Sequence, residues 1–184
     1  MSKIYLIRHG KTTANEQHLY CGSTDLPLSQ KGREELSVLK YDLDTENTVF
    51  ITSGMERTKQ TLKILFGEVE YLIDSRFKEI DFGIFEMKSY NELKDTAEYQ
   101  QWLEGDNHTN IPPQGESGAQ MEQRVLKAFE EIMLYEKDTV IITHGGVIAS
   151  IMANYFKEEN KNRYQWQPQP GHGYLLENNN YTIL

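Results

Sequence analysis

The sequence predicts an α/β fold in which a parallel sheet brings distant residues together at the carboxyl ends of its strands. The first observation is a short apolar run, Ile4–Ile7, that is followed by Arg8-His9-Gly10. The second is a similar run far downstream, Val140–Thr143, that is followed by His144-Gly145-Gly146. The third is the alternation of such runs with helix-like segments, which is typical of β-α units. Two histidines placed at neighbouring strand ends can share one pocket.

The N-terminal half predicts three strands and two helices. Ser29 is the predicted N-cap of a helix that runs to about Leu43, with leucines along one face. Ser53 and Glu56 match a capping box for a second helix, which runs through about Phe66. The predicted strands are Lys3–Arg8, Thr48–Thr52 and Val69–Ile73.

The C-terminal half predicts a long helix and three strands after an irregular stretch. Residues 77–117 contain scattered aromatics and prolines, and we expect a lid-like excursion with one or two short helices. Ser117 is the predicted N-cap of a helix to about Tyr135. Its predicted apolar stripe is Val125, Phe129, Ile132 and Met133. The other predicted elements are strands Val140–Thr143, Tyr174–Glu177 and Tyr181–Leu184 and helix Gly146–Phe156. Without repeats or linkers, residues 1–184 are predicted to form one domain.

Composition narrows the class of protein. Apolar residues make up 38% and charged residues 26%, which suits a globular protein, and the net charge of −9 argues against nucleic acid as a partner. The single cysteine, Cys21, precludes an internal disulfide and is interpreted as buried and non-catalytic. No signal-peptide core or membrane span is recognisable, so a cytoplasmic protein without a membrane partner is expected. The five histidines show no metal-ligand spacing.

Arg8 and His9 are the first candidates for chemistry. An isolated histidine at a strand end is more often structural, but here the flanking residues favour a site. Arg8 follows four apolar residues, and a guanidinium held near the core needs an anionic partner. Gly10 lets the backbone approach a ligand closely. The pattern predicts an anion site that His144 approaches from the second strand end.

Arg57 and a carboxylate extend this prediction to phosphoryl chemistry. Arg57 opens a helix, where free N–H groups and the guanidinium can bind one anion. A neutral histidine can act as a nucleophile towards phosphorus, and the leaving alkoxide then needs a proton. Glu79 is the preferred acid because apolar neighbours can raise its pKa. Asp81 and Glu86 remain rivals, and a solvated loop carboxylate is the alternative for each.

Six motifs together resemble the histidine phosphatase superfamily, which includes the cofactor-dependent phosphoglycerate mutases. The resemblance implies a three-layer sandwich with a mostly parallel central sheet and helices on both faces. This sequence differs from the family pattern at Lys11, where glutamate is usual, at Gly54-Met55, and at Met87, where glycine is common. The matching segments are Leu6–Thr12, Thr24–Gly32, Ser53–Thr61, Glu79–Gly83, Gly115–Ser117 and Thr143–Gly146.

The resemblance implies a role for each matching position. His9 would be the nucleophile that becomes phosphorylated, and Glu79 would be the proton donor that later activates water. The implied contacts of the phosphoryl group are Arg8, Asn15, Arg57, His144 and Gly145. Neither a metal nor a cofactor is needed in this scheme, and the partner is a small-molecule phosphate ester.

The resemblance favours a phosphatase over a mutase. Phosphoglycerate mutases of this superfamily are longer, and their basic, tyrosine-containing stretch has no counterpart in the acidic region 91–110. The segment His18–Asp25 is similar to enzymes that remove the 5′-phosphate of α-ribazole phosphate during cobalamin biosynthesis. A broad phosphatase for sugar or nucleotide phosphates and a phosphoglycerate mutase are the alternatives. A non-catalytic phosphate-binding module is disfavoured because His9 and Glu79 are present. Either a monomer or a homodimer is compatible with the sequence.

Aromatic residues in the excursion are the candidates for the substrate's surroundings. The predicted pocket roof is Tyr90, Tyr99, Trp102 and Leu103, with simple packing as the equal alternative for each. The predicted rim residues are His18, Tyr20 and His172.

Overall fold

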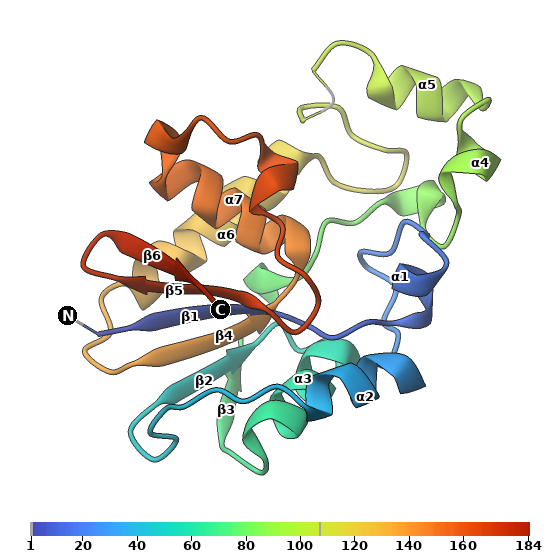
Figure 1. Cartoon of the computed structure of the whole chain (residues 1–184). Coiled ribbons are helices and arrows are strands. Elements are labelled where there is room, and N and C mark those ends of the chain that lie inside the picture. The colour runs from blue at the N-terminus through green and yellow to red at the C-terminus, as the bar shows by residue number, and fades with distance from the viewer. Residues whose placement is uncertain (1, 107) are drawn as a thin grey trace.

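Six strands form one sheet in the computed structural model, which describes residues 2–106 and 108–184. Their order is β3-β2-β4-β1-β5-β6. The strands are β1 Ile4–Arg8, β2 Val49–Thr52, β3 Tyr71–Ile73, β4 Thr139–Thr143, β5 Gly173–Glu177 and β6 Asn180–Ile183. Strands β1–β4 run parallel to one another, and β5 is antiparallel to both of its neighbours, β1 and β6, so the predicted mostly parallel sheet is confirmed (Figure 1).

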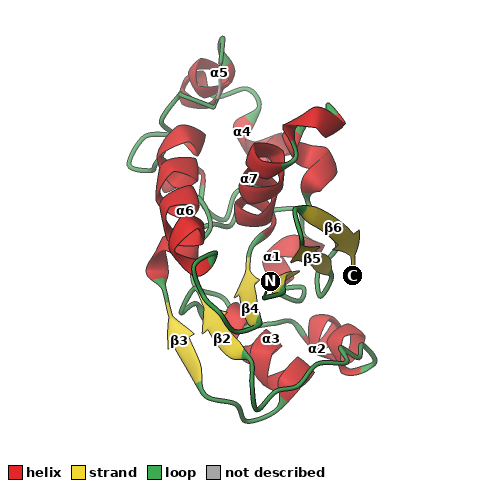
Figure 2. Cartoon of the chain, turned by 90° about the vertical axis from the view of Figure 1, so that its left-hand side faces the viewer, coloured by secondary structure: helices red, strands yellow, loops and turns green. Residues whose placement is uncertain are grey.

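Helices cover both faces of this sheet because successive side chains on a strand point to opposite sides. Ile4 and Leu6 pack in one core with α6 (Gly118–Ile132) and α7 (Gly145–Tyr155). Tyr5 and Ile7 pack in a second core with α3 (Glu56–Phe66), which lies against α2 (Gln30–Ser37). The strands lie between these two helical layers, which confirms the three-layer sandwich (Figures 1 and 2).

Local sequence explains the long helix and the C-terminal hairpin. Ser117 accepts from the Gln120 amide and Gln120 reaches back to the Ser117 amide, so a capping box starts α6. Asn178 and Asn179 have φ of 51° and 60°, and asparagine tolerates this left-handed conformation in the tight turn between β5 and β6. Met133 is predicted to lie in the apolar stripe, but it is 42% exposed because it is the C-cap of α6 and lies beyond its last turn.

The helix predicted from Ser29 to Leu43 is too long. Ser29 caps α2 as expected, but the helix ends at Ser37 and the chain continues as an irregular segment. Tyr41 and Leu43 still pack on the second core, and the Tyr41 hydroxyl donates to the Gly171 carbonyl at 2.5 Å. The leucine spacing therefore predicts which side chains are buried, but it does not predict a helix, because an irregular chain can bury the same side chains.

Two short helices, α4 (Tyr90–Leu93) and α5 (Ala97–Leu103), lie within the excursion and project from the sandwich (Figure 1). Phe85, Leu93 and Tyr99 form a small core of their own. We call residues 82–103 the aromatic lobe. Between Phe66 and this lobe lie β3 and a single-turn helix, Ser75–Phe77, and a second single-turn helix, Gly83–Phe85, lies at the start of the lobe. No helix of the described chain is long and apolar enough to cross a membrane.

Candidate active site

Strand register brings the predicted site residues together. Arg8 of β1 lies opposite Thr143 of β4, and Thr52 of β2 lies opposite Ile142. The chain therefore places the next residues of the three strands, His9, His144 and Ser53, side by side at the carboxyl edge of the sheet. The His9 and His144 rings are 5.0 Å apart between centroids, although most of the sequence separates them.

His9 is held as a neutral imidazole with one free nitrogen. Its Nδ1 lies 2.6 Å from the Gly10 carbonyl oxygen, and because a carbonyl only accepts, Nδ1 carries the proton. Nε2 then has the lone pair, and no hydrogen bond within residues 2–106 and 108–184 occupies it. Burial, reinforced by Arg57 and Arg8, holds the pKa of His9 well below its ordinary value. The ring is thus oriented and uncharged, as a nucleophile requires.

His144 is fully buried and has the opposite tautomer. Arg57 Nε donates to His144 Nδ1 at 3.3 Å, so the proton of the neutral ring lies on Nε2, which is 2.9 Å from Ser53 Oγ. Burial, with the nearby Arg57 charge, holds the pKa of His144 well below its ordinary value. Both ring nitrogens have protein partners, so His144 fixes the Arg57 guanidinium rather than carrying positive charge itself.

These two depressed pKa values predict acid sensitivity of the fold. In the unfolded chain both histidines bind protons below about pH 6.5, whereas in the folded protein they stay neutral. Lowering the pH from 6.5 to 5.5 should therefore reduce the free energy of unfolding by up to about 1.4 kcal/mol for each histidine. Urea unfolding at the two pH values measures this. Stability that is unchanged over that interval in both the protein and its His144→Gln variant would contradict the prediction, and His18→Gln is the exposed control.

Arg57 is a buried cation held by backbone carbonyls. Its side chain is 1% exposed, and its Nη1 and Nη2 donate to the carbonyl oxygens of Thr24 and Gly22 at 2.9 and 2.8 Å. Burial lowers its pKa, although nearby anionic groups oppose that shift. The guanidinium has five N–H donors and three are engaged by the protein in this way, so two remain for an anion.

Arg8 presents an unpaired donor in the same region. Its Nη1 donates to the Pro168 carbonyl at 2.8 Å, but Nε is buried without a hydrogen-bond partner in the described chain. A Cβ atom on Gly145 would come within 3.1 Å of the Arg8 guanidinium carbon, so the glycine gives the guanidinium room beside the start of α7. A buried donor without a partner costs free energy, and an anion bound at this point would satisfy it.

The two rival carboxylates, Glu86 and Asp81, accept hydrogen bonds that hold loops in place. Glu86 accepts from the amides of Gly22, Ser23 and Thr24, which turns the loop carbonyls towards Arg57. Asp81 accepts from the Ser23 hydroxyl and the Gly83 amide at 2.9 and 2.8 Å. Of the three candidate carboxylates, Glu79 is the one that accepts from an amide at the start of α7, next to His144. The sequence named Glu86 only as a rival acid and missed its role, because its partners lie more than 60 positions away.

Glu79 lies at the N-terminus of α7, directly beside the two histidine strand ends. Its Oε2 accepts from the Gly146 amide at 3.0 Å, and its Oε1 accepts from its neighbour Ile80. A Cβ on Gly146 would stand 2.5 Å from Oε1, so only glycine permits this approach. The glycine that the sequence associated with the second histidine thus positions the carboxyl group.

Asn15 and the N-terminus of α3 are both engaged by partners within the protein. Thr12 is the N-cap of α1 (Thr13–Glu16), and Asn15 completes the capping box because its Oδ1 accepts from the Thr12 amide at 3.0 Å, which leaves its amide Nδ2 for a ligand. The predicted Ser53–Glu56 capping box is wrong, since Met55 is the N-cap. The Glu56 amide instead donates to Asp25 at 2.8 Å, so the protein itself supplies the anion at the start of α3. This helix N-terminus is therefore not the free anion site that we expected beside Arg57.

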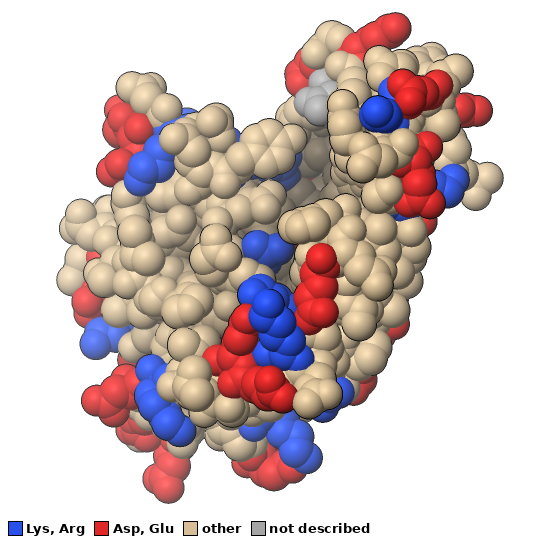
Figure 3. Space-filling model, turned by 45° about the vertical axis from the view of Figure 1, so that its right-hand side comes forward, with Lys and Arg blue, Asp and Glu red and all other residues tan. Residues whose placement is uncertain are grey.

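The predicted roof residues mostly pack against one another. Tyr99 is buried in the lobe and its hydroxyl is 2.5 Å from that of Tyr20. Trp102 contacts the rings of Tyr20, Phe82, Phe85 and Tyr99. Tyr90 and Leu103 are 57% and 38% exposed. Figure 3 shows a hollow in the surface between this lobe and the sandwich, with Lys and Arg side chains at its edge.

The residues that differ from the family pattern and the remaining candidate residues have partners of their own or are exposed. Met87, where the family commonly has glycine, holds a φ of 59° and donates to the Tyr20 carbonyl. Lys11 pairs with Glu35 at 2.9 Å. His18 is exposed, and His172 Nδ1 lies 3.1 Å from the Leu184 carbonyl oxygen; in the described chain neither has a hydrogen bond to His9. Cys21 is half-buried rather than buried, with its thiol 3.6 Å from the Thr24 carbonyl.

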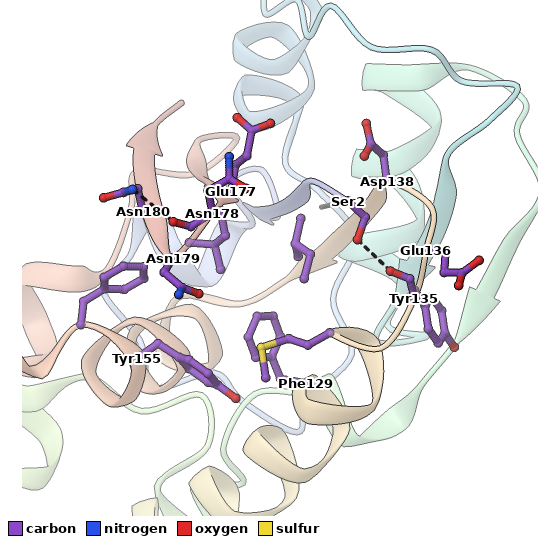
Figure 4. A pocket seen from close by; sticks show the side chains of 14 residues that line it. Ser2, Phe129, Tyr135, Glu136, Asp138, Tyr155, Glu177, Asn178, Asn179 and Asn180 are labelled. Atoms are coloured by element: carbon purple, nitrogen blue, oxygen red, sulfur yellow. Dashed lines mark hydrogen bonds between the residues drawn. The ribbon is translucent and has the colours of Figure 1, made fainter.

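Another hollow lies away from these residues. A cavity of about 660 Å³ is lined by Phe129, Tyr155 and Asn179, among others (Figure 4). Its wall includes Asp138, which precedes β4, whereas His144 follows the same strand, so this cavity lies at the opposite end of the sheet. Within the described residues, no three His, Cys, Asp or Glu side chains are grouped so that they could hold a metal ion.

Comparison with solved structures identifies the class of fold. The chain matches the α-ribazole phosphatase from Shigella flexneri with a TM-score of 0.84 and 25% identity, over 99% of this chain and 94% of that one. It matches the phosphoglycerate mutase from Thermus thermophilus with a TM-score of 0.74 and 24% identity, over 99% and 96%. The fold is thus that of phosphoglycerate mutase-like α/β proteins.

Comparison of sequences identifies the family. The model of the histidine phosphatase superfamily (branch 1) matches residues 4–182, and the chain belongs to this superfamily, whose members are phosphatases or mutases. A relative from Erwinia tasmaniensis, named probable phosphoglycerate mutase GpmB, is 30% identical over 162 residues, which are 82% of this chain and 74% of the relative.

Proposed function

We propose that the protein is a phosphomonoesterase that transfers the phosphoryl group of a small metabolite to His9 and then to water. The observation that carries this proposal is the orientation of His9. Its Nδ1 is anchored on the Gly10 carbonyl, while Nε2 is free in a site that also holds the buried Arg57 and the buried Nε of Arg8. Positioning and charge stabilisation are the main demands of phosphoryl transfer, and this arrangement meets both.

The first step replaces an ester bond by a phosphohistidine bond. Nε2 of His9 attacks phosphorus, the P–O bond to the alcohol breaks, and the proton of Glu79 passes to the departing oxygen. Arg8 Nε and the two free N–H groups of Arg57 stabilise the charge on the phosphoryl oxygens. The Asn15 side-chain amide and the Gly145 amide are the further proposed contacts.

The second step returns the enzyme to its starting state. Water attacks phosphorus, the P–Nε2 bond breaks, and the Glu79 carboxylate accepts the proton of the water. Inorganic phosphate leaves, and both His9 and Glu79 regain their original protonation. The two arginines supply the positive charge in this scheme, so we propose hydrolysis without a metal ion.

We propose α-ribazole 5′-phosphate as the first substrate to test. The Shigella flexneri structure, which matches nearly the whole chain, carries the name of that phosphatase. A broad phosphatase for sugar and nucleotide phosphates is the alternative within the same chemistry. Mutase activity is the second candidate function, and the 30% identity to the GpmB relative favours it.

A substrate panel discriminates among these activities. We expect α-ribazole 5′-phosphate to give a kcat/KM at least about tenfold above that of sugar and nucleotide phosphates, since distinct polar groups on a leaving group allow such discrimination. Release of inorganic phosphate with and without a chelator is the measurement, and the chelator should have no effect. Equal rates across the panel would remove the specific substrate. Conversion of phosphoglycerate without phosphate release would replace the phosphatase by a mutase.

A further inference from the structure

The guanidinium of Arg124, on α6, donates three of its five N–H groups to the chain segment that carries Glu79. Nη1 donates to the carbonyl oxygens of Arg76 and Lys78 at 2.7 Å each, and Nη2 donates to that of Glu79 at 3.1 Å. Nε and the second Nη2 hydrogen donate to the two carboxylate oxygens of Glu116, which forms a bidentate ion pair with Arg124. All five N–H donors of the guanidinium are used in this way.

The one carbonyl of residues 76–79 that Arg124 does not bind accepts from a side chain of β4. Thr143 Oγ1, at the end of β4, donates to the Phe77 carbonyl at 2.8 Å, and Phe77 itself is fully buried. Four consecutive carbonyl oxygens, those of residues 76–79, therefore accept side-chain donors from α6 or β4. Without such partners these groups would need water, because the segment forms no strand.

Glu116 ties the same segment to the start of α6. Its amide donates to the Asp81 carbonyl at 3.0 Å, and its carboxylate accepts from the Asp81 amide at 3.3 Å. Glu116 stands directly before the α6 N-cap, within the Gly115–Ser117 motif that the sequence singled out. The motif thus connects the acid segment, residues 76–81, to α6.

We propose that Arg124, oriented by Glu116, is the positioning residue that holds the Glu79 carboxyl group at the start of α7. Glu79 is bound on its carbonyl side by Arg124 and on its carboxyl side by the Gly146 amide. The guanidinium fork reaches three carbonyls at once, and a lysine ammonium at this position cannot match that geometry. The inference rests on the proposed function, because it presumes that Glu79 protonates the leaving group.

Leaving groups of different basicity provide the test. An alkoxide needs a proton to leave, whereas para-nitrophenolate is stable as an anion and needs little help. We therefore expect Arg124→Lys to lower kcat/KM for an alkyl phosphate about 100-fold and for para-nitrophenyl phosphate less than about fivefold. kcat/KM is the appropriate quantity because it reports departure of the first leaving group. Arg33→Lys is the control for the substitution itself, since that arginine is exposed on α2 and lies outside the acid segment.

Glu79→Gln and Glu116→Gln make the outcome decisive. Glu79→Gln should show the same leaving-group selectivity as Arg124→Lys, and Glu116→Gln a weaker form of it. If Glu79→Gln is selective but the Arg124 and Glu116 variants lose both substrates equally, Arg124 is only structural and the inference is overturned. If Glu79→Gln itself loses both equally, the acid role in the proposed function fails and the inference fails with it. Should Arg124→Lys not fold, Glu116→Gln alone decides between the first two results.

Discussion

Replacement of His9 by asparagine is expected to lower phosphatase activity by at least about 10⁴-fold, because the proposed reaction passes through a bond to its Nε2. Asparagine retains an amide near the position of Nδ1 and can still donate to the Gly10 carbonyl, so the loop should keep its shape. Burial and two nearby arginines hold the pKa of His9 low, so the folded protein disfavours the protonated form of this ring. We therefore do not expect its removal to impair folding.

Two measurements establish this result for His9. The rate of phosphate release gives the loss, and acid-labile radiolabelled phosphate trapped on the protein during turnover reports the covalent intermediate. His172→Asn is the matched control, since that ring lies at hydrogen-bond distance from the Leu184 carbonyl and, in the described chain, has no hydrogen bond to His9. A labelled protein or substantial turnover in the His9→Asn variant would contradict the mechanism, whatever the substrate.

Replacement of Arg57 by lysine should impair both activity and stability. We expect kcat/KM to fall about 10³-fold, because a positioned arginine on a phosphoryl group is worth this much. Lysine keeps the charge but cannot donate to the Gly22 and Thr24 carbonyls and His144 Nδ1 together. The lost hydrogen bonds are buried, so we also expect about 2–4 kcal/mol less free energy of unfolding.

The Arg57 prediction is checked by steady-state kinetics and urea unfolding of the same preparation. Arg33→Lys, an exposed change on α2, is the control for the substitution itself. A lysine variant with the stability and activity of the original protein would show that a single point charge suffices. Loss of stability without loss of activity would remove Arg57 from the phosphoryl site and leave it as a loop anchor.

Much of the architecture could be predicted because it follows from local pattern. The apolar runs before His9 and His144 have the length of buried strands, and the Ser117 capping box is contained within four residues. The extent of α2 could not be predicted, since burial of Leu43 depends on a core formed by residues distant in sequence. The family followed from six motifs in order, and the comparisons confirm it.

The sequence by itself determined which residue types stand at the strand ends, and hence the α/β fold and the superfamily. Tertiary structure decided how those residues are used. The proton position on each histidine depends on a partner that lies elsewhere, and only strand register shows that His144 meets Ser53 and Arg57. Asp25 at the start of α3, Glu86 beneath the 22–24 loop and Arg124 behind Glu79 act across long sequence separations. Hydrogen bonds are short-ranged and directional, so their partners are defined only when the chain has folded.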